Sequence, residues 1–201
     1  MSRNAYIESL NTVGIVSQAE AKLHLRVSQD DDNTYIDNLI MVAQQTIENY
    51  CNILLMRTTV IQRGDCWVDV SSLYFSPIKN SGNASITHIK YFDGDNVQQT
   101  WAASDYIVDV YSQPVRIGLA PGISLPGLAN RIDAIEVKYT IGGNSASSIP
   151  MALKQACLIL VGQWYENRQE AVVGRSVGVI PMTARYLMEP YKIQTLGIDV
   201  C

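Results

Sequence analysis

The stretch from Asp30 to Leu54 reads DDDNTYIDNLIMVAQQTIENYCNIL and predicts a long amphipathic helix. Its apolar side chains recur at steps of three and four residues, at Ile36, Leu39, Ile40, Ala43, Ile47, Tyr50, Cys51 and Leu54. This spacing places them in one stripe along an α-helix, and such a stripe must pack against another apolar surface. The carboxylates of Asp30, Asp31 and Asp32 precede the stripe, where they would offset the positive end of the helix dipole and cap free amides.

The partner of this stripe is predicted more than a hundred residues later. Pro150 suits the first turn of a helix, and the apolar positions behind it are Leu153, Cys157, Leu160, Val161 and Trp164. We expect this helix to pack on the 36–54 helix and to bury the ring of Trp164. Glu166 and Arg168 would point away from that contact.

Two shorter helices are predicted at the flanks. Ser17 and Glu20 have the spacing of a capping box, which would start a helix over residues 18–26. Pro181 opens a last helix that ends near Glu189, and residues 191–201 follow as a tail.

The pattern between the helices is that of an antiparallel β module. Short runs rich in β-branched and aromatic residues, several of them alternating apolar with polar side chains, occupy residues 58–62, 85–92, 97–101, 106–110, 115–117 and 134–141. Asp93–Asn96 reads as a hairpin turn, because Gly94 and Asn96 tolerate positive φ. We expect a sandwich or an open barrel.

The order of these elements predicts an α+β fold with a split helical core. Residues 1–56 would form its N-terminal part, residues 57–146 the inserted β module, residues 147–190 its C-terminal part, and residues 191–201 the tail. Helices from both ends of the chain would pack together, because each apolar stripe lacks a partner nearby in sequence.

Composition and charge exclude several classes of protein. The chain has 201 residues, of which 47% are hydrophobic and 17% charged, and this is a globular composition. No apolar run approaches the roughly 18 residues of a membrane span, and the first residues lack the apolar segment of a secretory signal. The net charge is −4, and residues 1–56 carry three basic and seven acidic side chains. A basic stripe that would grip nucleic acid through counterion release is therefore not expected.

The residues that usually carry chemistry are few. The chain has four cysteines without a Cys-x-x-Cys pair and two histidines, His24 and His88, so we expect no metal site. Cys51 and Cys157 fall on apolar helix faces, which favours buried thiols in a reducing cytoplasm. The sequence also lacks a nucleophile elbow, a phosphate-binding loop and the glycine of an EF-hand after Asp32. We predict neither a cofactor nor enzymatic activity.

Three segments in a common order carry a family resemblance. They are Ile15–Val27 followed by Asp30–Asp32, then Ile86–Asp95 with Ser104–Tyr106, and finally Ile149–Ala156 leading to Trp164–Glu170. In this order and spacing, roughly residues 13–191 resemble the head-to-tail connector proteins of tailed bacteriophages, also called adaptor or head-completion proteins.

The resemblance implies a structural virion protein, assembled in the host cytoplasm and located at the neck of the particle. Connectors form a ring, usually of twelve subunits, beneath the portal protein and above a downstream neck or tail protein. Genomic double-stranded DNA passes through the ring without sequence-specific binding, and no membrane is involved.

Three groups of residues take expected roles from this resemblance. Asp30, Asp31 and Asp32 would face the DNA channel, because an acidic wall repels phosphate at short range. Glu166 and Arg168 would pair between neighbouring subunits. The tail would dock on the portal through Tyr191, Ile193, Leu196, Ile198 and Val200.

Other functions stay open at this point. The chain could be a different neck or tail-completion protein, such as a stopper. From another class, the β module could be a domain that binds carbohydrate or protein. A soluble enzyme is the third alternative.

Overall fold

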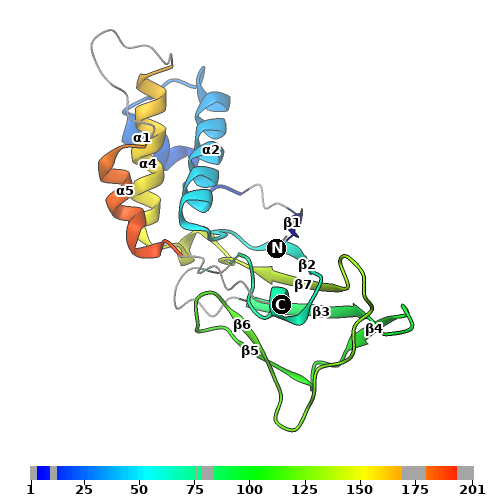
Figure 1. Ribbon diagram of the computed structural model, residues 1–201. Coiled ribbons are helices and arrows are strands. Elements are labelled where there is room, and N and C mark those ends of the chain that lie inside the picture. The colour runs from blue at the N-terminus through cyan, green and yellow to red at the C-terminus, as the bar shows by residue number, and fades with distance from the viewer. Residues whose placement is uncertain (1–3, 10–12, 76, 78–83, 169–179, 194–201) are drawn as a thin grey trace. The chain divides into compact units, whose positions relative to one another are not determined.

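The chain divides into two compact units in the computed structural model, which describes residues 4–9, 13–75, 77, 84–168 and 180–193 (Figure 1). The β unit comprises Met1–Asn11, Arg57–Gly143 and Ile193–Cys201. The helical unit comprises Thr12–Met56 and Asn144–Lys192. The predicted α+β class is confirmed.

The helical unit is built around one central helix. This helix, α4 (Met151–Glu166), contacts α1 (Gln18–Leu25), α2 (Asn33–Cys51) and α5 (Met182–Met188). Two short 3-10 turns, η1 (Ala146–Ser148) and η2 (Glu189–Tyr191), precede α4 and follow α5. Figure 1 shows α2 and α5 on either side of α4, so segments far apart in sequence form one bundle.

The predicted apolar stripes form the core of this unit. The buried side chains of α2 and α4 include Ile36, Leu39, Ile40, Ala43, Ile47 and Cys51, and Leu153, Ala156, Cys157, Leu160 and Val161. Cys51 and Cys157 are free thiols, and burial raises the pKa of each to about 12. The prediction that Trp164 is buried is wrong, since it is only half-buried. Trp164 lies in the last turn of α4, opposite the polar start of α2 rather than its apolar stripe.

The two predicted helix starts behave differently. Ser17 forms the predicted capping box: its Oγ accepts from the amide of Glu20 at 3.2 Å, and the Glu20 carboxylate accepts from the Ser17 amide at 2.8 Å. Asp32 occupies the N-cap of α2, yet within the described chain its side chain caps no amide. The capping prediction for Asp32 is therefore wrong, because Tyr165 and Arg168 engage its carboxylate instead.

The β unit contains an open five-stranded sheet with the strand order β1-β2-β7-β3-β4. Its strands are β1 (Asn4–Ser9), β2 (Thr58–Gly64), β7 (Ile135–Ile141), β3 (Ala84–Phe92) and β4 (Gln98–Trp101). A separate two-stranded sheet pairs β5 (Tyr106–Asp109) with β6 (Arg116–Leu119), and a short helix, α3 (Trp67–Val70), follows β2. All described pairings are antiparallel, as predicted.

Two features of this sheet differ from the prediction. The edge strand β1 was not predicted, because Asn4–Ser9 is short and finds its partner, β2, only about fifty residues later. Within the described residues β1 and β4 pair with one neighbour each, so the sheet stays open where a sandwich or an open barrel was expected. The predicted hairpin turn is present: the Asn96 amide donates to the Asp93 carbonyl at 2.8 Å, and Asn96 has φ of 59°.

Candidate assembly surfaces

A cluster of four side chains joins the start of α2 to the end of α4, and we call it the terminal cluster: Asp32, Tyr35, Tyr165 and Arg168. The Asp32 Oδ2 atom accepts from the Tyr165 hydroxyl at 2.5 Å and from Arg168 Nη2 at 2.9 Å. The Arg168 guanidinium lies 4.6 Å from the centre of the Tyr35 ring and 5.1 Å from that of Tyr165. One arginine thus makes an ion pair and two cation–π contacts, which anchor the segment after α4.

The charges in the terminal cluster stabilise one another. The hydrogen bond from Tyr165, followed by the bond and charge of Arg168, lowers the pKa of Asp32. The same carboxylate raises the pKa of the Tyr165 hydroxyl. Asp32 is therefore ionised and Tyr165 neutral near pH 7, and the negative charge of Asp32 is balanced by Arg168.

The three acidic residues before α2 do not form one set of free carboxylates. Asp30 accepts from Lys22 Nζ at 2.7 Å, and this bond is the main cause of its lowered pKa. Asp32 is paired with Arg168, whereas Asp31 is exposed. Two of the three negative charges predicted to face a channel are thus paired within the chain.

The predicted interface residues, Glu166 and Arg168, lie at the same end of the helical unit. Glu166 is exposed. Arg168 has a partner within its own chain, Asp32, which the sequence reasoning did not anticipate. Arg168 lies beyond the end of α4, so no helical spacing in the sequence reported its pairing with Asp32.

The predicted docking tail is described only at its start. Tyr191 is half-buried within η2, and Ile193 is 6% exposed, so the Ile193 side chain offers little surface to a partner. Leu196, Ile198 and Val200 lie outside the described residues.

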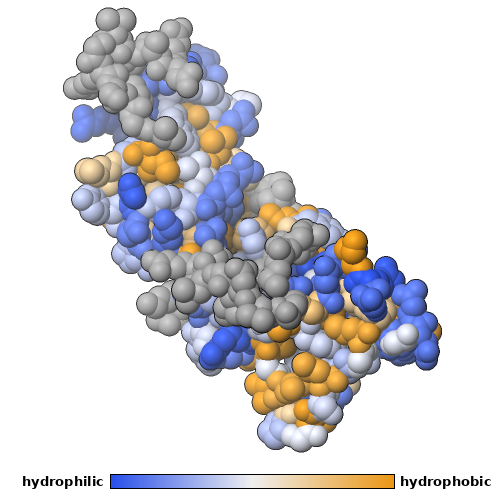
Figure 2. Space-filling model, in the orientation of Figure 1, coloured by the Kyte–Doolittle hydropathy of each residue, from blue (hydrophilic) through white to orange (hydrophobic). Residues whose placement is uncertain are grey.

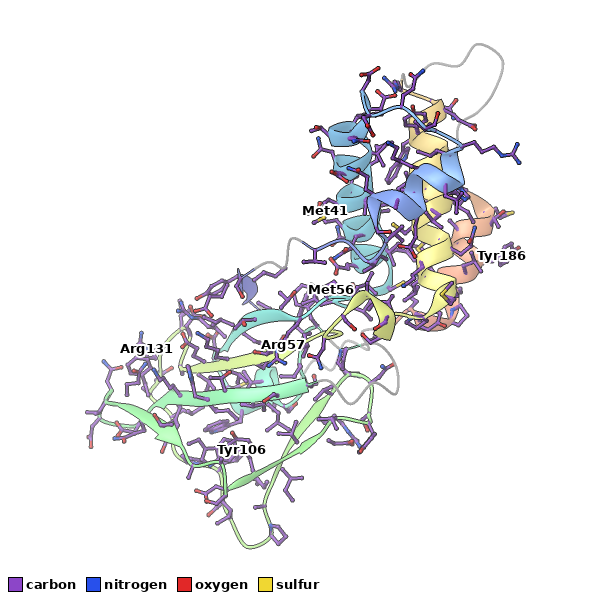
Figure 3. All side chains as sticks on the ribbon, turned by 180° about the vertical axis from the view of Figure 1, so that it is seen from behind. Met41, Met56, Arg57, Tyr106, Arg131 and Tyr186 are labelled. Carbon is purple, nitrogen blue, oxygen red and sulfur yellow. The ribbon has the colours of Figure 1, made fainter. Side chains whose placement is uncertain are left out.

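Two further surfaces of the helical unit were not predicted. On α5, Met182 is 71% exposed and Tyr186 is 70% exposed, and a spacing of four residues places them on one face, which we call the α5 ridge. A groove of about 500 Å³ lies beside α2 and is lined by Val13, Gly14, Val16, Ser17, Gln18, Glu20, Asp37, Ile40, Met41 and Ala146; we call it the α2 groove. In Figure 3, Met41 projects from α2 on one side of the helical unit and Tyr186 from α5 on the other.

The β unit has an apolar cavity of about 180 Å³. It is lined by Trp67, Val68, Val70, Ser71, Ile89, Trp101, Ile117, Gly118, Leu119 and Leu125. The rings of Trp67 and Trp101 lie 4.7 Å apart, and the buried Trp101 Nε1 has no hydrogen-bond partner among the described residues. Figure 2 shows hydrophobic residues gathered at the end of this unit where β5 and β6 lie.

Membrane and metal signatures were sought over the same residues. None of the described helices combines the length and the apolar character that crossing a bilayer requires. The described residues hold no group of three or more histidine, cysteine or acidic side chains placed to bind a metal ion.

Comparison with known proteins identifies a domain that includes α1 and α2. Residues 18–90 match the phage gp6-like head-tail connector protein family. The similarity to the head-tail connector family therefore covers residues 18–90, which is less than half of the chain. The resemblance predicted from the sequence is confirmed. The match runs from the capping box of α1 to β3, so it includes α2 but ends before α4 and α5.

Solved structures extend the likeness in fold over nearly the whole chain. A chain from the virion of a native gene transfer agent (GTA) particle has a TM-score of 0.74 and 21% identity, over 96% of this chain and 97% of that one. A chain from the neck of an empty GTA particle, computed with C6 symmetry, has a TM-score of 0.70 and 19% identity over 96% and 98%. A chain from the neck of a native GTA particle, computed with C12 symmetry, has a TM-score of 0.68 and 21% identity over 98% of both chains. No curated protein matches.

Proposed function

We propose that this chain is a structural subunit of the neck of a phage-like particle, where it forms a ring that joins head to tail. The observation that carries the proposal is that the chain resembles two chains from GTA necks over 96–98% of its length, while residues 18–90 match the connector family. The similar necks computed with C12 and C6 symmetry favour a ring, and twelve subunits is the copy number we propose.

The proposed ring has three partners. The portal protein lies on one side, a downstream neck or tail protein on the other, and genomic double-stranded DNA passes through the channel. Negative-stain images of the pure protein, and of the protein mixed with portal, test this arrangement. Closed rings, alone or seated on the portal, are expected; particles without rings under both conditions would refute the connector role.

The start of α2, with Asp30, Asp31 and Asp32 before it, is proposed to face the DNA channel. Ion pairs already balance Asp30 and Asp32, so the net local charge comes from the exposed Asp31. A weakly acidic wall suits a channel through which DNA must slide, because it offers phosphate no binding site. Asp31→Lys should leave ring assembly intact and slow DNA ejection, since a ring of lysines would hold phosphate.

The matched control is Asp95→Lys, an exposed position in the β3–β4 turn. Both variants change the charge equally, so only the place of the charge differs. If DNA is ejected at the same rate from particles with either variant, the start of α2 does not line the channel.

Glu166 and Arg168 are proposed to contribute to the contact between subunits, with Arg168 acting in two ways. Arg168→Ala and Asp32→Ala both break the ion pair within the chain. If Arg168 also binds the neighbouring subunit, Arg168→Ala should weaken ring formation more than Asp32→Ala, although the two variants melt alike. If the two variants weaken ring formation equally, Arg168 contacts only residues of its own chain.

The tail is proposed to dock on the portal through Tyr191, Ile193, Leu196, Ile198 and Val200. Because Ile193 is buried in this structure, we expect the later residues to supply most of the contact. A chain that ends after residue 193 should lose binding to portal and keep its fold. If the shortened chain binds portal as well as the full chain does in a pull-down, the tail is not the docking segment.

The apolar cavity of the β unit supports a second candidate, a protein-binding module. Its lining is almost entirely apolar and includes two tryptophans, which suits an apolar protein segment better than a carbohydrate, whose hydroxyls need polar partners. Trp101→Ala should then reduce binding of the downstream neck protein while rings still form. Binding to a glycan array that Trp101→Ala abolishes would favour the carbohydrate module.

A further inference from the structure

We propose that neighbouring subunits join head to tail, with the α5 ridge of one copy seated in the α2 groove of the next. The occupant of the groove is thus a second copy of this chain. The inference rests on the proposed ring and names the contact that would close it.

The α5 ridge is an apolar surface that the described part of the chain leaves exposed. Helix α5 presents two apolar pairs, each with a spacing of four residues. Ala184 and Met188 are buried against the bundle, whereas Met182 and Tyr186 are exposed on another side of the helix. Methionine and tyrosine are both enriched at protein interfaces, because they offer large contact areas. A short helix with apolar residues on two sides is well suited to lie between two subunits.

The α2 groove has both apolar and acidic lining residues. Gly14 is one of them, and a Cβ atom at this position would come within 2.8 Å of Ile40 Cγ2, so a larger residue would displace its neighbours. Ile40 and Met41 supply apolar side chains, and Glu20 and Asp37 supply carboxylates. A volume of about 500 Å³ lies within the range of roughly 300–1,000 Å³ that holds a drug-sized ligand. The side chains of one methionine and one tyrosine need less.

The placement of the two surfaces fits a ring better than a two-fold dimer. Met41 and Tyr186 project from opposite sides of the helical unit (Figure 3). A head-to-tail contact joins two different patches, so each subunit keeps one free patch for the next copy, and the series closes into a ring when the rotation between copies divides a full turn. A two-fold dimer would pair one patch with itself and would leave the other exposed.

Arg185 beside the ridge and the carboxylates of the groove carry opposite charges, with Glu189 in the same hydrogen-bonded group as Arg185. Arg185 lies beside Tyr186 in the sequence and is exposed, and its Nε donates to the Tyr50 hydroxyl at 3.0 Å. The groove carries Glu20 and Asp37. The positive charge of the ridge would therefore meet negative charges at the groove, which sets the register of the contact.

Cysteine cross-linking tests the contact directly in the full chain. Met41→Cys and Tyr186→Cys are combined in one chain, and a short bismaleimide is added to assembled rings. Covalent multimers should then rise in steps to the size of the ring. A mixture of the two single variants should give covalent dimers only, and each single variant alone should stay monomeric, which controls for the natural cysteines.

The outcomes separate this inference from the connector role. Rings that form without a bond between positions 41 and 186 would overturn the contact and leave the connector role standing. Cross-linking of either single variant to itself would overturn the head-to-tail arrangement. Absence of rings both alone and with portal would refute the connector role and this contact with it.

Charge reversal provides an independent test. Arg185→Glu and Asp37→Arg should each raise the protein concentration needed for ring formation at least tenfold, and the double variant should recover most of this loss. Circular dichroism melting of each variant controls for folding. If the double variant assembles no better than the worse single variant, Arg185 does not meet Asp37.

Discussion

The buried carboxylate of Glu48 supports a prediction about how the helical unit ends its second helix. Glu48 lies on α2 and is 9% exposed. Its Oε1 atom accepts from the Leu55 amide at 2.9 Å and from Gln44 Nε2 at 3.3 Å, and its carboxylate also accepts from the Met56 amide. One side chain therefore holds the buried segment that leads out of α2.

The cost of removing this carboxylate follows from the groups that it satisfies. Glu48→Ala leaves the amides of Leu55 and Met56 buried without their acceptor. Each such group costs about 1–3 kcal/mol, so the variant should lose about 2–6 kcal/mol of unfolding free energy. Glu48→Gln keeps one acceptor oxygen and should lose less than about 2 kcal/mol.

Urea unfolding followed by far-ultraviolet circular dichroism measures this loss, because the described helices lie in the helical unit except for the short α3. Gln45→Ala is the matched control, since Gln45 is an exposed residue of the same helix. If Glu48→Ala is as stable as Gln45→Ala, the carboxylate does not hold the segment.

The pH dependence provides a second measurement on the same variants. Burial raises the pKa of Glu48, so the folded chain takes up this proton at a higher pH than the unfolded chain. Stability from this group is therefore present at low pH and is lost as pH rises through the folded pKa. The unfolding free energy of the natural chain relative to Glu48→Gln should increase as pH falls from neutral toward the ordinary pKa of a glutamate. Parallel profiles would refute the raised pKa, because the other acids are common to both proteins and cancel.

Two further predictions concern the cores of the two units. Leu160→Ala should cost about 2–5 kcal/mol of unfolding free energy in urea, because Leu160 is fully buried in α4. Met151 is exposed on the same helix, so the control Met151→Ala should cost less than about 0.5 kcal/mol. Gln62→Ala should cost about 2–5 kcal/mol, because the buried Gln62 amide satisfies three backbone groups of the 69–74 segment, and the exposed Gln98→Ala is its control. Tryptophan fluorescence should report the lower stability of Gln62→Ala, because two of the three tryptophans lie in the β unit. An unchanged urea midpoint for this variant would show that water replaces these hydrogen bonds.

Local signals were sufficient for most of the secondary structure. The capping box at Ser17, the stripe of α2 and Pro150 before α4 each depend on residues within a few turns, so the chain order alone carries them. The hairpin at Asp93 was predictable for the same reason. By contrast, β1 has little pattern of its own and is stabilised by pairing with β2, which no local signal reports.

The candidate sites depended more on distant contacts. Asp32 was read as a helix cap, and Arg168 as a partner for another subunit. The two residues are separated by 136 positions and pair with each other. Leu23 illustrates the same difficulty: it is an apolar residue of α1 and yet is 81% exposed. A periodic pattern states which residues are apolar, but only the packing of other elements decides which of them are covered.

The sequence by itself therefore determined the α+β class and the resemblance to connectors, because periodicity, caps and turns are local properties of the chain. The tertiary structure alone decided that Asp32 is paired, that Ile193 is buried, and that Met182 and Tyr186 stay uncovered. The pairing or exposure of each of these side chains depends on which distant surfaces pack together. That packing is set by the burial of apolar area and the pairing of charges over many residues at once.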